Sequence, residues 1–303
     1  MKLKRRIALV VAILMFASVL STFAFPALEQ SLEDYSAKLV EAQQLLFELG
    51  VPQDVISLMT DAQIINILEN IDLEVAIPEF SSFSIVDFAY NEAGDLYKLS
   101  EIVITLYETT VYLFDSSGTI IEHFSCDSRS GIAPLSIPTS DLTLRLTGFR
   151  SGTHNGVPRY QLFPSFIWHR PVKVTGDAFA FSVFHGWEVI AGENVNLRLW
   201  NRNWQGTLLH YVDLAPDVTQ SSGFGFRVPS NVGNFQVLME GHAFFFARRW
   251  ADEQSTQRAL TMNYAHDRRT FFSRITISIG FGVISISSPT GHRFDTRSAN
   301  LTF

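Results

Sequence analysis

The chain has 303 residues, of which 17% are charged, 26 are phenylalanine and one is cysteine. The net charge is −7, or −11 without the four basic residues near the N-terminus, and a negative surface repels nucleic acid and anionic lipid, so neither is an expected partner. The single cysteine, Cys126, excludes an intramolecular disulfide and a zinc site built from several thiolates.

The first 24 residues have the layout of a secretory signal peptide. Four basic residues between Lys2 and Arg6 precede the apolar run Ile7 to Leu20, and small residues then lead to Ala24. We expect cleavage after Ala24 and a mature protein that is secreted or held at the cell surface. If the segment stays uncleaved, it becomes an anchor, and the membrane is contacted only through this N-terminal segment.

Residues 25–77 are expected to form a short helical unit. Apolar residues recur three and four apart from Leu28 to Leu49, and Gly50 is a typical residue just past a helix end. Pro52 suits the first turn of a second helix, and the capping-box spacing from Thr60 to Gln63 predicts the start of a third.

Residues 78–303 are expected to form one β domain, because the apolar period changes from 3.6 to 2 after Pro78. The alternating sets include Ile102/Ile104, Leu142/Leu144/Leu146, Phe179/Phe181/Val183, Val195/Leu197/Leu199, Phe235/Val237/Met239 and Ile275/Ile277/Ile279. No helical run long enough for a parallel crossover separates them. The sequence therefore predicts a mainly β protein, an antiparallel, jelly-roll-like β-sandwich preceded by the helical unit.

Two segments look apolar on both faces, Phe235 to Phe246 and Phe271 to Ile286. Strands in the middle of packed layers show such continuous apolarity, whereas edge strands carry more charge. We therefore predict that both segments are central strands.

Tryptophans cluster in the middle of the chain and are the candidate ligand-binding residues. An exposed indole ring stacks on sugar rings, and neighbouring Asn and Arg side chains bind hydroxyl groups. Aromatic residues that alternate along strands are also typical of core positions, so both interpretations stay open. The candidates are Trp168, Trp187, Trp200 and Trp204.

Three acidic residues near aromatic strands are the candidate catalytic groups: Glu188, Glu193 and Glu240. Two carboxylates at a suitable separation are the machinery of most glycoside hydrolases. No sequence rule pairs these three. The eight histidines are scattered without metal-ligand spacing, and no phosphate loop, dinucleotide fingerprint or nucleophile elbow occurs, so we expect neither a metal nor a cofactor.

Leu49 to Gln63, together with Phe166 to Pro171 and Asp177, resembles segments of uncharacterised exported proteins of Gram-positive bacteria. The resemblance covers about a tenth of the chain. It implies a signal, a short helical unit and then a β domain, and it implies no function.

The sequence thus favours a non-enzymatic exported binding module that recognises a glycan or another surface protein through loops or an aromatic face. The first alternative is a glycan-active hydrolase that uses two of the three glutamates. The second is a structural protein of the cell envelope.

Overall fold

The computed structural model divides into two compact units, Met1–Leu45 and Leu46–Phe303. It describes residues 34–74, 80–90, 96–105, 108–117, 119–127, 141–170, 176–190, 195–203, 205–206, 208–229, 238–250, 258–266, 275–287 and 295–303. The expected signal peptide, residues 1–24, lies outside these ranges. Residues 34–48 are helical, and no helix in the described ranges combines the length and the apolarity that a membrane crossing requires. The predicted domain bounds, 25–77 and 78–303, stay a prediction.

Two short helices of the second unit begin close to where the sequence predicts. Helix α2 spans Gln53–Leu58 and follows Pro52. Helix α3 spans Asp61–Asn70, and the backbone N–H of Gln63 donates to the hydroxyl of Thr60 at 3.2 Å. The Thr60 side chain therefore caps α3, because it satisfies one of the N–H groups that a helix start leaves without a partner.

The rest of the described chain is β structure in three sheets. The strands are β1 (Phe80–Tyr90), β2 (Leu96–Ile104), β3 (Glu108–Phe114), β4 (Ile120–Asp127), β5 (Leu142–His154), β6 (Val157–Trp168), β7 (Asp177–Val183), β8 (Trp187–Val189), β9 (Leu197–Arg202), β10 (Leu208–Leu214), β11 (Val218–Gln220), β12 (Gly223–Val228), β13 (Leu238–Ala243), β14 (Phe245–Arg249), β15 (Ala259–His266), β16 (Thr276–Gly280), β17 (Val283–Ser287) and β18 (Asp295–Thr302).

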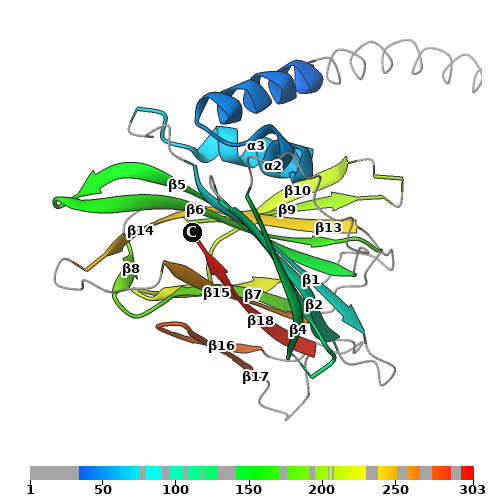
Figure 1. The fold of residues 1–303 in the computed structure, drawn as a ribbon. Helices are drawn as coiled ribbons and strands as arrows, with labels where there is room; N and C mark the ends of the chain where they lie inside the picture. The colour runs from blue at the N-terminus through cyan, green and yellow to red at the C-terminus, as the bar shows by residue number, and fades with distance from the viewer. Residues whose placement is uncertain are drawn as a thin grey trace, which may run out of the picture. The chain divides into compact units, whose positions relative to one another are not determined.

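Eleven strands form the larger sheet, in the order β10-β9-β13-β6-β5-β1-β2-β3-β4, with β14 beside β6 and β8 beside β14. Five strands form the smaller sheet, in the order β11-β12-β7-β15-β18. All neighbouring strands in the described ranges pair in antiparallel fashion, and Figure 1 shows the two sheets as stacked layers. The predicted antiparallel β-sandwich, preceded by helices, is confirmed.

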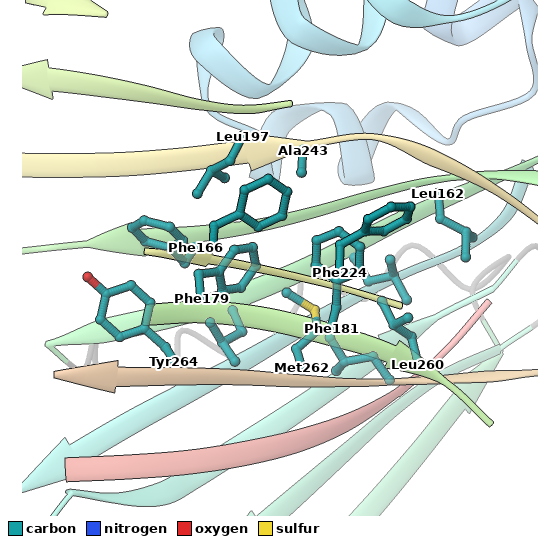
Figure 2. Packing of buried hydrophobic residues seen from close by; sticks show 14 of the residues in the cluster. Leu162, Phe166, Phe179, Phe181, Leu197, Phe224, Ala243, Leu260, Met262 and Tyr264 are labelled. Carbon is teal, nitrogen blue, oxygen red and sulfur yellow. The ribbon is translucent and has the colours of Figure 1, made fainter. Parts of the chain in front are cut away.

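The core lies between the two sheets and is rich in phenylalanine. From the larger sheet, Phe166 packs edge-to-face on Phe179 and Tyr264 of the smaller sheet, with ring centroids 5.0 Å and 4.6 Å apart. Phe181 stacks on Phe245 across the same space at 4.8 Å. Figure 2 shows these side chains filling the layer between the strands. Their burial contributes to the stabilisation that the sandwich obtains from the hydrophobic effect.

The opposite face of the larger sheet carries the helices α2 and α3. The Gln63 amide donates to the hydroxyl of Thr147 on β5 at 3.1 Å. The Gln161 amide on β6 donates to the carbonyl of Asn70, at the end of α3, and the backbone N–H of Asp72 donates back to Gln161 at 3.3 Å. These three hydrogen bonds pair polar groups of the helices with polar groups of the sheet across this second interface.

One strand prediction is wrong. Phe271 to Ile286 is not a central strand, because the described part of it folds back as the separate hairpin β16–β17, with Gly282 at φ +67° in its turn. One face of the hairpin packs Ile277 against Ala178 and Ala180 of the smaller sheet, and the other residues alternate toward solvent. The segment that looks continuously apolar in the sequence consists of two strands with alternating apolar residues, and Gly280 and Gly282 lie where the two strands meet. The described part of the other segment, 238–246, is central, since β13 lies between β9 and β6 and β14 lies between β6 and β8.

Candidate functional site

The structure places two of the three candidate acids in the described chain, and each is bound to arginine. Glu188 on β8 accepts from Arg248 on β14, with its Oε1 2.6 Å from Nη2. Glu240 on β13 is buried and lies 3.1 Å from Nε of Arg202. Glu193 lies outside the described residues, so every pairing that includes it stays a prediction.

Glu240 sits in a hydrogen-bonded network beneath α3. Its Oε2 accepts from the Thr60 hydroxyl at 3.0 Å and lies 3.3 Å from Nε2 of His242. Burial by itself raises the pKa of this carboxyl, but the hydrogen bond and charge of His242 and the charge of Arg202 together lower the pKa to about 2. Glu240 is therefore ionised at neutral pH, and both of its oxygens already have hydrogen-bond partners, which suits a structural role better than proton transfer.

Glu188 and Glu240 lie far apart along the same edge of β6. Arg248, the partner of Glu188, pairs with Arg159 on β6, whereas Glu240 pairs with Ile167. Eight residues of extended strand separate these two positions, which is roughly 25 Å. The two carboxylates of a glycoside hydrolase lie about 5–10 Å apart.

Three of the four candidate tryptophans are described, and their side chains are covered by protein. Trp168, Trp187 and Trp200 are 1%, 3% and 4% exposed. Each ring packs on a tyrosine: Trp168 on Tyr264, Trp187 on Tyr160 and Trp200 on Tyr211. Trp204 lies outside the described residues. Ligand binding by these four residues stays a prediction.

In the described ranges, no three His, Cys, Asp or Glu side chains come together as metal ligands. The tightest such pair is His266 and Asp177, with Nδ1 2.9 Å from Oδ2. The Tyr264 hydroxyl donates to the same Oδ2 at 2.7 Å. This triad joins β7 to β15 inside the protein, where the hydrogen bonds satisfy the buried carboxylate.

A groove on β2, β3 and β4 combines aromatic, hydroxyl and carboxylate groups. It has a volume of about 380 Å³. Its lining consists of Lys98, Glu101, Val103, Thr105, Glu108, Thr110, Tyr112, Phe114 and Ile120. Below we call it the β2–β4 groove. Its volume falls within the range of small-molecule sites, about 300–1,000 Å³.

The groove exists because the larger sheet is wider than the smaller one. One cross-strand row runs from Leu144 and Val86, which are in the core, through Glu101 and Tyr112 to His123. The edge strand β18 of the smaller sheet packs against β1, β2 and β5. Beyond β18 the same face continues onto β3 and β4, so side chains that would otherwise be core line a surface groove.

Aromatic and charged groups alternate along this groove. The Tyr112 ring lies beside the His123 ring with centroids 6.3 Å apart and planes inclined by 21°. Lys98 pairs with Glu101 at 3.1 Å and lies 3.9 Å above the Phe114 ring. Burial raises the pKa of Glu101, while the charge of Lys98 opposes that rise. The result is a partly apolar surface with hydrogen-bonding groups at its sides.

The sequence interpretation missed Tyr112, although the signal was present. Thr110, Tyr112 and Phe114 alternate with Val111 and Leu113, which places the first three on one face of a strand. Nothing in the sequence says that this face is uncovered, because that depends on where the second sheet ends.

Comparisons with known proteins return solved structures of low identity and low TM-score. No protein-family model and no curated protein matches the sequence. The pilus backbone protein RrgB of Streptococcus pneumoniae is 11% identical, with a TM-score of 0.25 over 38% of this chain and 41% of that chain. The present chain therefore matches less than half of the length of that protein.

Two further solved structures show the same level of similarity. The collagen-binding domain of the surface protein RspB of Erysipelothrix rhusiopathiae is 10% identical, with a TM-score of 0.31 over 71% of this chain and 73% of that chain. A carbohydrate-binding module of the β-sandwich superfamily is 9% identical, with a TM-score of 0.20 over 56% of this chain and 82% of that chain.

Proposed function

We propose that this protein is an exported, non-enzymatic binding module that works at or outside the cell surface and holds a neutral glycan in the β2–β4 groove. The observation that carries the proposal is the groove itself, in which Tyr112 lies between hydroxyl and carboxylate side chains. Apolar C–H faces of sugars pack on aromatic rings, and their hydroxyl groups donate to carboxylates and threonine hydroxyls.

The chemistry of the groove favours binding over hydrolysis. Glu101 is paired with Lys98, and Glu108 accepts a hydrogen bond from Ser125 across the strand pair. Both carboxylates therefore have fixed partners and remain acceptors for hydroxyl groups. A glycoside hydrolase would instead require two carboxyl groups without such partners, one on each side of the scissile bond.

Replacing Tyr112 by alanine is expected to weaken glycan binding about tenfold or more, because it removes the main aromatic surface of the groove. The purified protein is first applied to an array of glycans that includes cell-wall polymers, and the affinity of each hit is then measured by calorimetry. Tyr211→Ala is the matched control, since Tyr211 is an exposed tyrosine on the opposite edge strand, β10. Equal losses in the two variants, or a loss in Tyr211→Ala alone, would place the glycan elsewhere.

A protein partner is the second candidate, and the edge strand β10 favours it. Every residue of β10 except Leu214 is exposed, including Leu209 at 54% and Tyr211 at 55%. Exposed apolar edge strands accept an added strand from another chain. A proline at Val212 would block such an added strand while leaving the groove intact, so a pull-down with this variant separates the two candidates.

A further inference from the structure

A second cavity lies at the opposite side of the larger sheet from the β2–β4 groove, next to β6, β8 and β14. It has a volume of about 230 Å³ and is lined by Pro158, Tyr160, Trp187, Arg249 and Arg258, which we call the arginine pocket. The register explains the grouping. Trp187 on β8 pairs with Arg249 on β14, and Tyr160 on β6 pairs with Ala247, two residues before Arg249 on the same strand. These side chains therefore lie on one face of the larger sheet.

Two hydrogen-bond donors in this pocket have no acceptor in the described chain. The Nε atom of Arg249 and the Nε1 atom of Trp187 are both buried and without a hydrogen-bond partner. A buried donor without an acceptor costs stability, and the cost is larger for a charged group. Both residues that carry these unpaired donors line the cavity, so a bound acceptor is one explanation for them.

The described lining of the pocket is positively charged. It includes two arginines and no acidic side chain. Glu188 follows Trp187 on β8, so its side chain lies on the opposite face of the sheet. There it binds Arg248 at 2.6 Å. Two guanidinium groups at one site contrast with the net charge of −7 of the whole chain.

The remaining walls are aromatic. The Tyr160 and Trp187 rings are 5.6 Å apart, and both pack edge-on against Phe303. Arg258 lies above the Tyr160 ring at 5.7 Å, and its Nη1 donates to the Tyr160 hydroxyl at 3.3 Å. The three aromatic rings contact one another, and Tyr160 contacts Arg258 beside the cavity.

We propose that the arginine pocket binds the oxyanion of a small acidic sugar, a carboxylate or a phosphate. Guanidinium groups bind both oxyanions through paired, charge-assisted hydrogen bonds, and the indole N–H of Trp187 supplies a further donor. The aromatic walls accept the apolar face of the sugar ring. The cavity is smaller than a drug-sized site, so it takes a single sugar residue. This site is independent of the β2–β4 groove and of the glycan proposed there.

The first test is titration of the purified full chain with four probes: glucuronate, glucose 6-phosphate, glucose and inorganic phosphate. At least one of the two acidic sugars is expected to bind, glucose is not, and the comparison of the two acids identifies the preferred oxyanion. The indole N–H resonance of Trp187, assigned with a Trp187→Phe variant, is expected to shift on binding. Equal binding of glucose, or no binding of either acidic sugar, would overturn the proposal. Binding of inorganic phosphate with the same affinity would show that the sugar contributes nothing and would overturn that part of it.

The second test removes each guanidinium in turn. Arg249→Gln and Arg258→Gln are each expected to weaken binding of the acidic sugar about 10- to 100-fold, because each removes a charge-assisted contact. Arg227→Gln is the control, since Arg227 is an exposed arginine of β12 paired with Asp217. Thermal unfolding of each variant shows whether the fold is intact, and Arg249→Lys, which keeps the charge, is expected to lose less affinity than Arg249→Gln. Unchanged affinity in both glutamine variants would overturn the assignment.

Discussion

Replacing Glu240 by glutamine is expected to lower the free energy of unfolding by about 3 kcal/mol at pH 7. The carboxylate accepts from Thr60 and Arg202 and lies against His242 in a buried position. Glutamine has nearly the same shape but no charge, so it leaves the guanidinium of Arg202 partly buried without its counter-ion. Urea unfolding of the two proteins measures the difference.

The loss of unfolding free energy in Glu240→Gln is expected to become smaller as the pH falls. The pKa of Glu240 is lowered in the folded state from the ordinary value of 4.5 to about 2, so ionisation stabilises the folded protein above pH 4.5. That contribution is lost as the pH falls from about 4.5 toward 2. Burial raises the pKa of Asp87 and of Glu101, which act in the opposite direction, but they are present in both proteins. The difference between native protein and variant therefore shrinks between pH 5 and pH 3.

Glu188→Gln is the matched control for this experiment. Glu188 also pairs with an arginine, but about a quarter of each side chain is exposed, so the loss is expected to stay below about 1 kcal/mol. Losses of equal size at Glu240 and Glu188, or a loss at Glu240 that does not change with pH, would contradict the assignment of a buried ionised carboxylate.

Replacing Gly223 by alanine is expected to destabilise the protein by about 3 kcal/mol, because the added methyl group meets backbone. A Cβ at this position would lie 2.0 Å from the carbonyl oxygen of Phe181 and 2.8 Å from Cα of Ser182. Gly223 begins β12 and pairs with Ser182 near the end of β7, so these two strands would have to separate there. Overlap with backbone costs more than overlap with the end of a side chain, which moves aside.

Gly280→Ala is the control, because a Cβ at Gly280 has no atom within 4 Å. Its effect on the free energy of unfolding is expected to be within about 0.5 kcal/mol, as for most surface substitutions. Thermal unfolding monitored by circular dichroism measures both variants. A Gly223→Ala protein as stable as the Gly280→Ala protein would show that the two strands are not in such close contact.

Local features were predictable where neighbours in the sequence decide them. Thr60 and Gln63 predicted a helix start, and the hydroxyl of Thr60 does accept from the N–H of Gln63. The apolar period of 2 predicted an antiparallel sandwich, because alternating residues of one strand lie on opposite faces. The period could not distinguish a central strand from a hairpin packed on one side, so the position of Ile275 to Ile286 was predicted wrongly.

The candidate sites were harder to predict, because a side chain's exposure depends on residues far away in the chain. The tryptophans were candidates for a binding face, yet the described ones are covered by tyrosines from other strands. Glu240 has Thr60 as a partner, and 180 residues separate the two positions. No spacing rule reaches across such a distance.

By itself, the sequence determined the mainly β class, the antiparallel sandwich, the helices that precede it and the absence of a disulfide within the chain, because propensity, periodicity and cysteine count act locally or by composition. Only the tertiary structure decided that β3 and β4 extend past β18 and leave Tyr112 in a groove, and that Arg249 and Trp187 meet beside a cavity. Which face of a strand is covered depends on the relative widths of two sheets. The width of each sheet is set by pairing between segments that are distant in the sequence, and no local pattern encodes this pairing.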